Sequence, residues 1–362
     1  MIASALSAPL SLLLRSRAAR GVARTRPLCL NAVSAEVGAS AHPPVTCFYA
    51  DWAEVPLPEG HRFPMHKYAE TRLLLEQEAS LSGRLNLRPS PLVSLEDLHR
   101  AHCPVYADAV LNGTLTAAEQ RAVGFPWSRE HVTRSLASTG GTVAAMHLVL
   151  SGAPEAPVSP QQPRSRHRCA LQIAGGTHHA HRERGGGFCV FNDQAVAAHA
   201  ALHNYALQRI LIVDLDVHLG DGTASIFADE PRVTTFSMHG EKNYPWRAAV
   251  PSDYDVDLPD GTGDEAYLAK LNEMLPLLFE RHQPQLVFYQ AGVDPLKGDA
   301  FGRLALSRAG LQARNNAVFS ACLRAGAPLV AVMGGGYTRP SHRSVEAHAD
   351  VFRAAALRFS VP

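Results

Sequence analysis

Two aspartates and a histidine follow one apolar segment of this sequence at every second position. Residues 210–212 are Ile, Leu and Ile, a pattern that predicts a buried strand. Because side chains alternate along a strand, Asp214, Asp216 and His218 would point to the same side. Two close carboxylates repel each other unless a cation or a proton lies between them. The alternative is a solvated strand end beside a turn, but the apolar segment leaves the acids little polar surface to share. We therefore predict a metal site here.

Three other apolar segments are also followed by polar residues. The segments are residues 169–173, 285–290 and 329–333, and the polar residues after them are His178 with His179, Asp294, and Tyr337. Helical patterns separate the segments, which predicts a single-domain α/β fold with a doubly wound, mainly parallel sheet and helices on both faces. In such sheets ligands bind beyond the carboxyl ends of the strands. The four polar clusters are therefore predicted to meet in one site.

The residue types in these clusters suit metal-assisted hydrolysis. Asp216, His218 and Asp294 offer two carboxylates and an imidazole without a thiolate, a set that suits zinc with one position open for water. His178 and His179 follow a Gly-Gly turn, from which their imidazoles could reach a metal-bound water.

Three further residues complete this chemistry. Asp214 and Asp221 are the natural carboxylates to fix the tautomers of the two histidines. Tyr337 follows three glycines, and its phenol could donate to an oxyanion. Together these groups predict attack of water on a carbonyl.

Four longer motifs contain these residues: GGTHHAHRERGGGFCVFND, DLDVHLGDGT, QAGVDPLKGD and GGGY, in that order. Together they resemble the zinc-dependent histone deacetylase family of the arginase/deacetylase superfamily. The earlier segments HRFPMHKY and GFPWS are most similar to the class IV and bacterial members. So is Leu219, where class I members have a second histidine. The resemblance extends from about residue 45 to about residue 359.

The resemblance implies a role for each matching residue. The ligands of one catalytic Zn²⁺ would be Asp216, His218 and Asp294. The catalytic residues would be His178 and His179, supported by Asp214 and Asp221 respectively, and the oxyanion-binding Tyr337. The substrate channel would contain Gly187, Phe188 and Tyr244. Members of the family also bind a monovalent cation such as K⁺, and the matching groups are Asp214, Asp216, His218, Ser237 and Met238, some of them through backbone carbonyls.

The expected function is that of a zinc-dependent amidohydrolase that removes acetyl, or a longer acyl group, from lysine side chains of proteins. One alternative is a deacetylase for acetylpolyamines or other small acylated amines. Another is an inactive binding module, although the intact ligands, histidines and Tyr337 argue against it. Arginase-like chemistry is disfavoured because the two-metal ligand set is missing. His181 and His199 are interpreted as surface or core histidines and not as ligands.

Composition restricts the partners and the compartment. The chain has 362 residues, 46% of them apolar and 19% charged, with a formal net charge of +1. The first 35 residues contain five arginines and no acid, so the rest of the chain has a net charge of −4. With no lysine-rich tract, direct nucleic-acid binding is not expected. Six cysteines without a CxxC pair favour free thiols in a reducing compartment.

The amino-terminal residues differ in composition from the rest of the chain. Residues 1–40 are predicted to be a transit peptide for a mitochondrion or chloroplast, and residues 41–362 the catalytic domain. The alternative for residues 1–40 is a disordered extension, with a nuclear or cytoplasmic protein. Their apolar run is too short to cross a membrane. The oligomeric state is left open.

Two local patterns concern the fold alone. Residues 132–150 are predicted to form a helix broken at Gly140 and Gly141, and a second helix is predicted to begin near Leu73. Residues 152–165, rich in Pro, Ser and Gln, are predicted to be a surface insertion.

Overall fold

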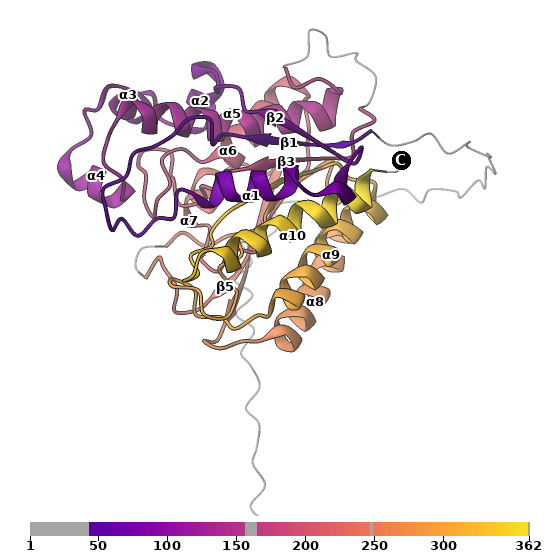
Figure 1. Cartoon of the computed structure of the whole chain (residues 1–362). Coiled ribbons are helices and arrows are strands. Elements are labelled where there is room, and N and C mark those ends of the chain that lie inside the picture. Colours follow the sequence, from indigo (N-terminus) through magenta and orange to yellow (C-terminus); the bar gives the residue numbers. More distant parts are fainter. Residues whose placement is uncertain (1–42, 156–164, 247–248, 361–362) are drawn as a thin grey trace, which may run out of the picture.

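One parallel sheet runs through the centre of the protein (Figure 1). The computed structural model describes residues 43–155, 165–246 and 249–360. In this part of the chain the strands are β1 (Val45–Tyr49), β2 (Leu85–Pro89), β3 (Cys169–Ile173), β4 (Ile210–Asp214), β5 (Val233–Gly240), β6 (Tyr254–Leu258), β7 (Leu286–Gln290) and β8 (Leu329–Val332). They form one sheet in the order β2-β1-β3-β8-β7-β4-β5-β6, and every neighbouring pair is parallel.

Helices cover both faces of this sheet. They are α1 (Lys67–Glu76), α2 (Leu95–Ala101), α3 (Pro104–Asn112), α4 (Ala117–Val123), α5 (Arg129–Ser151), α6 (Asp193–Asn204), α7 (Asp221–Ile226), α8 (Asp264–His282), α9 (Arg308–Ala325) and α10 (His342–Phe359), with a short 3₁₀ helix η1 (Ala79–Leu81). On one face α1 packs on α10, α10 on α9, and α9 on α8, whereas α2, α5 and α6 pack together on the other. The predicted doubly wound α/β architecture is confirmed.

The central strands are the ones that the sequence predicts best. Every residue of β3, β4, β7 and β8 is buried, so each strand is a nearly continuous apolar run. The edge strands β2 and β6 were not predicted. β2 is largely exposed and ends in Arg88 and Pro89, and β6 contains two aspartates that alternate with buried residues. Edge positions accept such sequences because one side of the strand has no partner.

Helix α5 runs without a break from Arg129 to Ser151, so the predicted interruption at its two central glycines is wrong. Both glycines serve close packing. A Cβ on Gly140 would lie 2.1 Å from the carbonyl oxygen of Pro91, and one on Gly141 would lie 2.3 Å from Nε2 of Gln172 on β3. The helix therefore tolerates the intrinsic cost of glycine, about 1 kcal/mol per residue, because neighbouring segments need the space.

One other helix limit differs from the predicted one, since α1 begins at Lys67 and not near Leu73. α8 continues through Pro276 to His282. The short helices α4 and α7 were not predicted, because six or seven residues are too few to show a helical period. α2 and α3 are separate helices, and α3 begins at Pro104.

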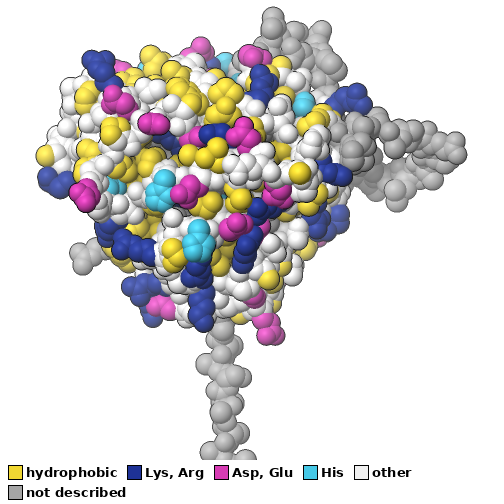
Figure 2. Space-filling view, viewed as in Figure 1, with side chains coloured by type: hydrophobic (Ala, Val, Ile, Leu, Met, Phe, Trp, Pro, Cys, Tyr) yellow, Lys and Arg dark blue, Asp and Glu magenta, His cyan; other side chains and the backbone are white. Residues whose placement is uncertain are grey.

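Lys and Arg side chains are interspersed with Asp and Glu over the face shown in Figure 2. Among the described residues no helix is long and apolar enough to cross a membrane.

The five cysteines in this part of the chain are free thiols, four of them buried. The predicted targeting segment, residues 1–40, and most of the predicted insertion at residues 152–165 lie outside the described residues.

We expect Gly140→Ala to destabilise the protein, because the added methyl group would lie 2.1 Å from a backbone oxygen, that of Pro91. Overpacking of this kind costs about 1–3 kcal/mol in the free energy of unfolding, which urea denaturation would measure. Gly263→Ala is the matched control, since its Cβ would meet only the carbonyl oxygen of Ala305 at 4.0 Å. Unchanged stability of Gly140→Ala would show that the loop of Pro91 moves aside without cost.

Candidate active site

The polar clusters after the four central strands meet at one cavity. β3, β8, β7 and β4 are neighbours in the sheet, and the segments after their carboxyl ends surround a cavity of about 930 Å³. Its lining includes eight predicted site residues: His178, His179, Gly187, Phe188, Asp216, His218, Tyr244 and Tyr337. The other three, Asp214, Asp221 and Asp294, are paired to histidines of this lining.

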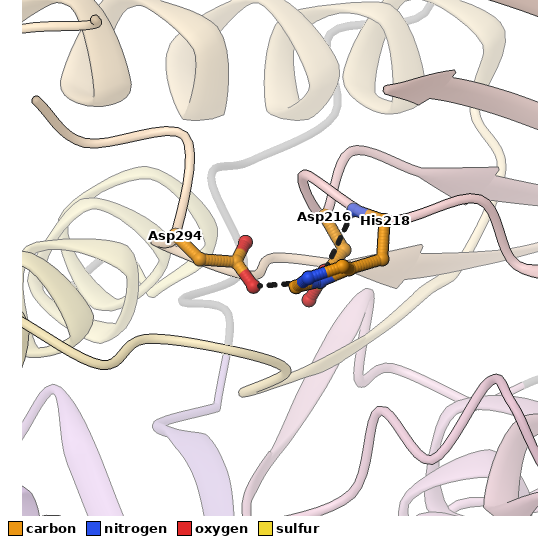
Figure 3. A group of neighbouring side chains, drawn as sticks. All are labelled: Asp216, His218 and Asp294. Atoms are coloured by element: carbon orange, nitrogen blue, oxygen red, sulfur yellow. Dashed lines mark hydrogen bonds and ion pairs between the residues drawn. The ribbon is translucent and has the colours of Figure 1, made fainter. Parts of the chain in front are cut away.

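Asp216, His218 and Asp294 point toward one another (Figure 3). Two carboxylate oxygens and one imidazole nitrogen, one atom from each residue, lie within 4.8 Å of one another. His218 Nδ1 is 2.9 Å from Asp216 Oδ1 and 3.3 Å from Asp294 Oδ2. All three side chains are buried. Donors of these types at these separations could hold one divalent cation.

Backbone N–H groups orient both carboxylates. Val217 N–H donates to Asp294 Oδ1 at 2.9 Å, and Gly335 N–H donates to Asp216 Oδ2 at 2.8 Å. Asp294 Oδ2 is buried and accepts no hydrogen bond from the described residues. A Cβ at position 335 would lie 2.0 Å from this oxygen, so only glycine allows the backbone to come so close. A buried oxygen that accepts no hydrogen bond, beside a second carboxylate and 3.3 Å from His218 Nδ1, fits a bound metal ion.

The charges of this group lead to the same conclusion. Burial, reinforced by the neighbouring Asp216 carboxylate, raises the pKa of Asp294 to about 7. Burial also opposes a charge on His218, but Asp216 and Asp294 together raise its pKa to about 10. The two carboxylates thus draw a positive charge, here a proton on the imidazole, into the space between them. A metal ion would replace that proton, because a histidine ligand binds in its neutral form.

The two adjacent histidines each lie against their own carboxylate. His178 Nδ1 donates to Asp214 Oδ2 at 2.6 Å, and His179 Nδ1 donates to Asp221 Oδ1 at 2.8 Å. These are the two pairs that the sequence analysis expects. Because a carboxylate holds Nδ1 of each ring, Nε2 is left for contacts in the cavity.

The surroundings of the two histidines move their pKa values in opposite directions. Burial opposes a charge on His178, but Asp214 and Asp216 raise its pKa to about 9. Burial, and then the positive charge of His178, lower the pKa of His179 to about 3. At neutral pH these shifts favour a protonated His178, which can supply positive charge, and a neutral His179, which can accept a proton.

Tyr337 lies on the segment after β8, and a carboxylate fixes its backbone. Asp299 Oδ2 accepts from Tyr337 N–H at 2.6 Å, while Asp299 Oδ1 accepts from the N–H groups of Phe301 and Gly302 at 2.9 and 3.0 Å. The Tyr337 and Phe301 rings pack with their centroids 4.8 Å apart. Burial, followed by the charges of Asp294 and Asp216, raises the pKa of Tyr337 well above its usual value. The phenol therefore keeps its proton at neutral pH and can donate it to a hydrogen bond.

Aromatic rings form the walls of the cavity. Phe188 has φ = +66°, a left-handed backbone conformation that few non-glycine residues adopt, and its ring lies 6.3 Å from that of Phe301. The Tyr244 ring lies 4.7 Å from the His179 ring. A Cβ on Gly187 would lie 2.7 Å from His179 Cδ2, so a larger residue would displace the histidine. Such walls suit an unbranched apolar segment of a ligand.

The chain is similar to known proteins. The family model described as the histone deacetylase domain matches residues 61–352. The chain belongs to the histone deacetylase family. Membership of this family, and similarity to the histone deacetylase-like amidohydrolase of Pseudomonas aeruginosa, support hydrolase activity. An uncharacterized protein of Picosynechococcus sp. is 43% identical to it over 300 residues, which cover 83% of this chain and 94% of that protein.

Two further proteins are similar over part or most of the chain. Polyamine deacetylase HDAC10 of Rattus norvegicus is 36% identical over 236 residues, which cover 58% of this chain but only 37% of that protein. The crystal structure of an HDAC homologue complexed with SAHA superposes with a TM-score of 0.71 at 24% sequence identity. This match covers 88% of this chain and 85% of the homologue, and it shows that the two share a fold.

A buried lysine that sequence analysis missed supports the tyrosine of this deacetylase family site. Lys67 Nζ donates to the carbonyl oxygens of Gly334 and Gly336, at 3.1 and 3.4 Å, in the turn before Tyr337. It also lies 4.9 Å from the Tyr337 ring centroid. Burial lowers the pKa of Lys67 to about 8, although nearby carboxylates oppose this. Lys67 lies in the HRFPMHKY segment, but the sequence of that segment gave no signal of this role.

Two other buried charged side chains hold the segments that carry the site. Arg314 on α9 donates through Nη1 to the carbonyl oxygens of Leu215 and Gly292, at 3.0 and 2.6 Å, next to the candidate metal ligands. Asp193 Oδ1, at the start of α6, accepts from Gly176 N–H at 2.9 Å, just before the paired histidines. Arg314 is separated from its two partners by 99 and 22 positions, and Asp193 lies 17 positions from Gly176 within one motif, so neither contact follows from neighbouring residues.

His181 has a more specific place than sequence analysis assigned to it. It is buried, and its Nε2 lies 3.1 Å from Asp221 Oδ2, so Asp221 contacts two histidines at once. It is not part of the candidate metal group, in agreement with the prediction. His199 is half-buried and packs against Phe227 with ring centroids 5.0 Å apart.

We expect the purified protein to bind about one divalent metal ion per chain and Asp294→Ala to lose that binding. The variant lacks the buried oxygen that accepts no hydrogen bond, so the site would have two ligands in place of three. Added metal should raise the melting temperature of the wild type but not of the variant, because only a binding protein gains stability from its ligand.

Asp229→Ala is the control for this experiment, since Asp229 is exposed and lies outside the metal group. Its melting temperature should respond to metal as the wild type does. Full metal occupancy of Asp294→Ala in elemental analysis would contradict the assignment.

Proposed function

We propose that this chain is a zinc-dependent amidohydrolase that removes acetyl, or a longer acyl group, from lysine side chains of proteins. One observation carries the proposal: a single aromatic-walled cavity brings together a three-residue metal group, two histidines with their own carboxylates, and a protonated tyrosine. Each component of amide hydrolysis then has a candidate residue. Membership of the histone deacetylase family supports the reaction class.

Zinc held by Asp216, His218 and Asp294 would act as a Lewis acid toward the amide carbonyl and would acidify a water molecule. His179, neutral because burial and His178 lower its pKa to about 3, would take the proton from the attacking water. It would then give this proton to the leaving amine.

The remaining groups would stabilise the negative charge that develops on the carbonyl oxygen. Tyr337 would donate its phenol hydrogen to this oxygen. His178, protonated at neutral pH because Asp214 and Asp216 raise its pKa to about 9, would add positive charge beside it. Phe188 and Tyr244, as cavity walls, would contact the methylene groups of the lysine side chain.

We further propose that a monovalent cation such as K⁺ would bind near the candidate zinc site. Its oxygen ligands would come from Asp214, Asp216, His218, Ser237 and Met238. The register of the sheet supports this choice, because Asp214 on β4 pairs with Ser237 on β5 and Met238 follows directly.

The proposal has two rivals. The rat relative named as a polyamine deacetylase supports a small acylated amine as substrate. An inactive binding module would need no catalytic groups, whereas here both histidine–carboxylate pairs are formed. The test is to assay the purified enzyme with acetyl-lysine peptides, longer acyl-lysine peptides and acetylpolyamines. Hydrolysis of acetylpolyamines alone would overturn the protein substrate, and no hydrolysis of any of them would overturn the enzyme.

Tyr337→Phe should lower kcat by about 10²–10³ on the best acyl-lysine peptide, the usual effect of deleting one oxyanion donor. The ring and its packing on Phe301 remain, and the metal ligands are untouched, so metal content should not change. KM should change much less than kcat, because the lost hydrogen bond is strongest in the transition state. Near-native turnover would show that Tyr337 only packs against the glycine turn.

We also propose that residues 1–40 direct the protein to a mitochondrion or chloroplast. The support is compositional: five arginines and no acidic residue in the first 35 residues. A fluorescent protein fused to residues 1–45 should enter an organelle, and the same fusion with the five arginines changed to alanine should not. A diffuse cytosolic or nuclear signal from the first fusion would contradict import.

A further inference from the structure

The mouth of the cavity is basic. Its lining includes four exposed basic side chains from four separate segments of the chain: Arg62, Arg121, Lys242 and Arg303. Among the described residues that line the cavity, the only carboxylate is Asp216, which is buried in the candidate metal group. A ligand that enters from solvent therefore meets positive charge first.

Little of this charge is neutralised by neighbouring side chains. Arg303 lies 3.3 Å from the exposed carboxylate of Asp260. Arg62, Arg121 and Lys242 form no ion pair with other residues in the described part of the chain. The chain after residue 35 has a net charge of −4, so the basic rim is a local feature and not a consequence of overall charge.

Aromatic side chains connect this rim to the interior of the cavity. The Arg62 guanidinium lies 5.3 Å from the ring centroid of Phe301, which in turn packs against Tyr337. On another part of the rim, Trp246 is 74% exposed and packs on the Tyr244 ring at 5.5 Å. An exposed tryptophan beside basic groups provides an apolar surface for a substrate segment outside the channel. The rim can thus contact parts of a substrate that lie outside the channel, in addition to the acylated amine.

The sign of the charge distinguishes the substrate classes. An acylated polyamine keeps at least one ammonium group, which would have to pass or remain near several like charges. An acyl-lysine is neutral at the reacting side chain, and only its neighbours in the polypeptide carry charge. Carboxylates in those neighbours would be attracted to the rim, and basic neighbours would be repelled.

We propose that the preferred substrates are acyl-lysines flanked by aspartate or glutamate, and that the rim formed by Arg62, Arg121, Lys242 and Arg303 selects them over acylated polyamines. This inference rests on the proposed deacylase function and specifies its substrate class. The rim residues act on selection at the entrance and take no part in the chemical step.

The test uses two acyl-lysine peptides of equal length that differ only in having glutamate or lysine at the flanking positions, with an acetylpolyamine as a third substrate. At about 0.01 M ionic strength, where the Debye length is about 30 Å, kcat/KM for the acidic peptide should exceed that for the basic peptide by about tenfold or more. At about 1 M, where the Debye length is about 3 Å, the ratio should approach one. The acetylpolyamine should be hydrolysed more slowly than the acidic peptide.

A charge-reversal variant ties the effect to the rim. Arg121→Glu combined with Lys242→Glu should reduce the ratio of acidic to basic kcat/KM to one or below. A general loss of activity cancels in this ratio, so partial misfolding does not imitate the result. The control, Lys270→Glu combined with Arg324→Glu, makes the same charge change on α8 and α9, outside the cavity lining, and should keep the wild-type ratio.

Equal kcat/KM for the two peptides, or a ratio that the rim variant leaves unchanged, would overturn the inference while leaving the deacylase function in place. Faster hydrolysis of the acetylpolyamine would also overturn it. If neither peptide were hydrolysed, the proposed protein substrate itself would fail.

Discussion

The burial of Asp216 beside Asp294 is the constraint on which the site depends. Each carboxylate has one oxygen fixed by a backbone N–H group, from Gly335 and Val217, so neither can turn away from the other. Two such anions without solvent are unfavourable unless a positive charge lies between them. The fold therefore stores an unfavourable arrangement that only a cation or a proton relieves. The packing of the segments after β4, β7 and β8 holds the two carboxylates together. For this reason it also sets the affinity of the site for a metal ion.

Buried charged side chains hold those segments without taking part in the chemistry. Arg314 donates to three backbone carbonyl oxygens and Lys67 to two, in segments that carry the candidate metal group and the tyrosine. Asp193 and Asp299 accept from backbone N–H groups in the turns before the paired histidines and at Tyr337. Charged side chains form stronger hydrogen bonds to the backbone than neutral side chains do. Such bonds suit these segments, which lie beyond the ends of the strands and outside the hydrogen-bond pattern of the sheet. The rigidity of the loops thus comes from side chains that lie behind them.

The sequence predicts best what depends on residues close together in the chain. Every residue of β4 and β7 is buried, so their apolar sequences predict both strands, and the polar residues that follow them predict the position of the site. Edge strands β2 and β6 lack that burial, and the role of Gly140 depends on Pro91, which belongs to another segment. The supporting residues are hidden for the same reason: Arg314 is separated from Leu215 by 99 positions, and only the folded chain brings them together. Local sequence therefore yields the reacting groups, whereas the groups that orient them require the tertiary structure.

The residues proposed for the reaction lie at the base of the cavity, whereas the residues proposed to select the substrate lie at its mouth. The groups at its base are buried, and the chemistry requires their types and positions, so family membership says much about them. The groups at its mouth are exposed and come from loops or helix ends, where a change of charge costs little stability. A chain can therefore keep the hydrolytic base of the family while its mouth adapts to a different partner. A difference at the mouth would be enough to change the substrate, because a cationic polyamine and an acidic protein segment meet the mouth before they reach the candidate metal group.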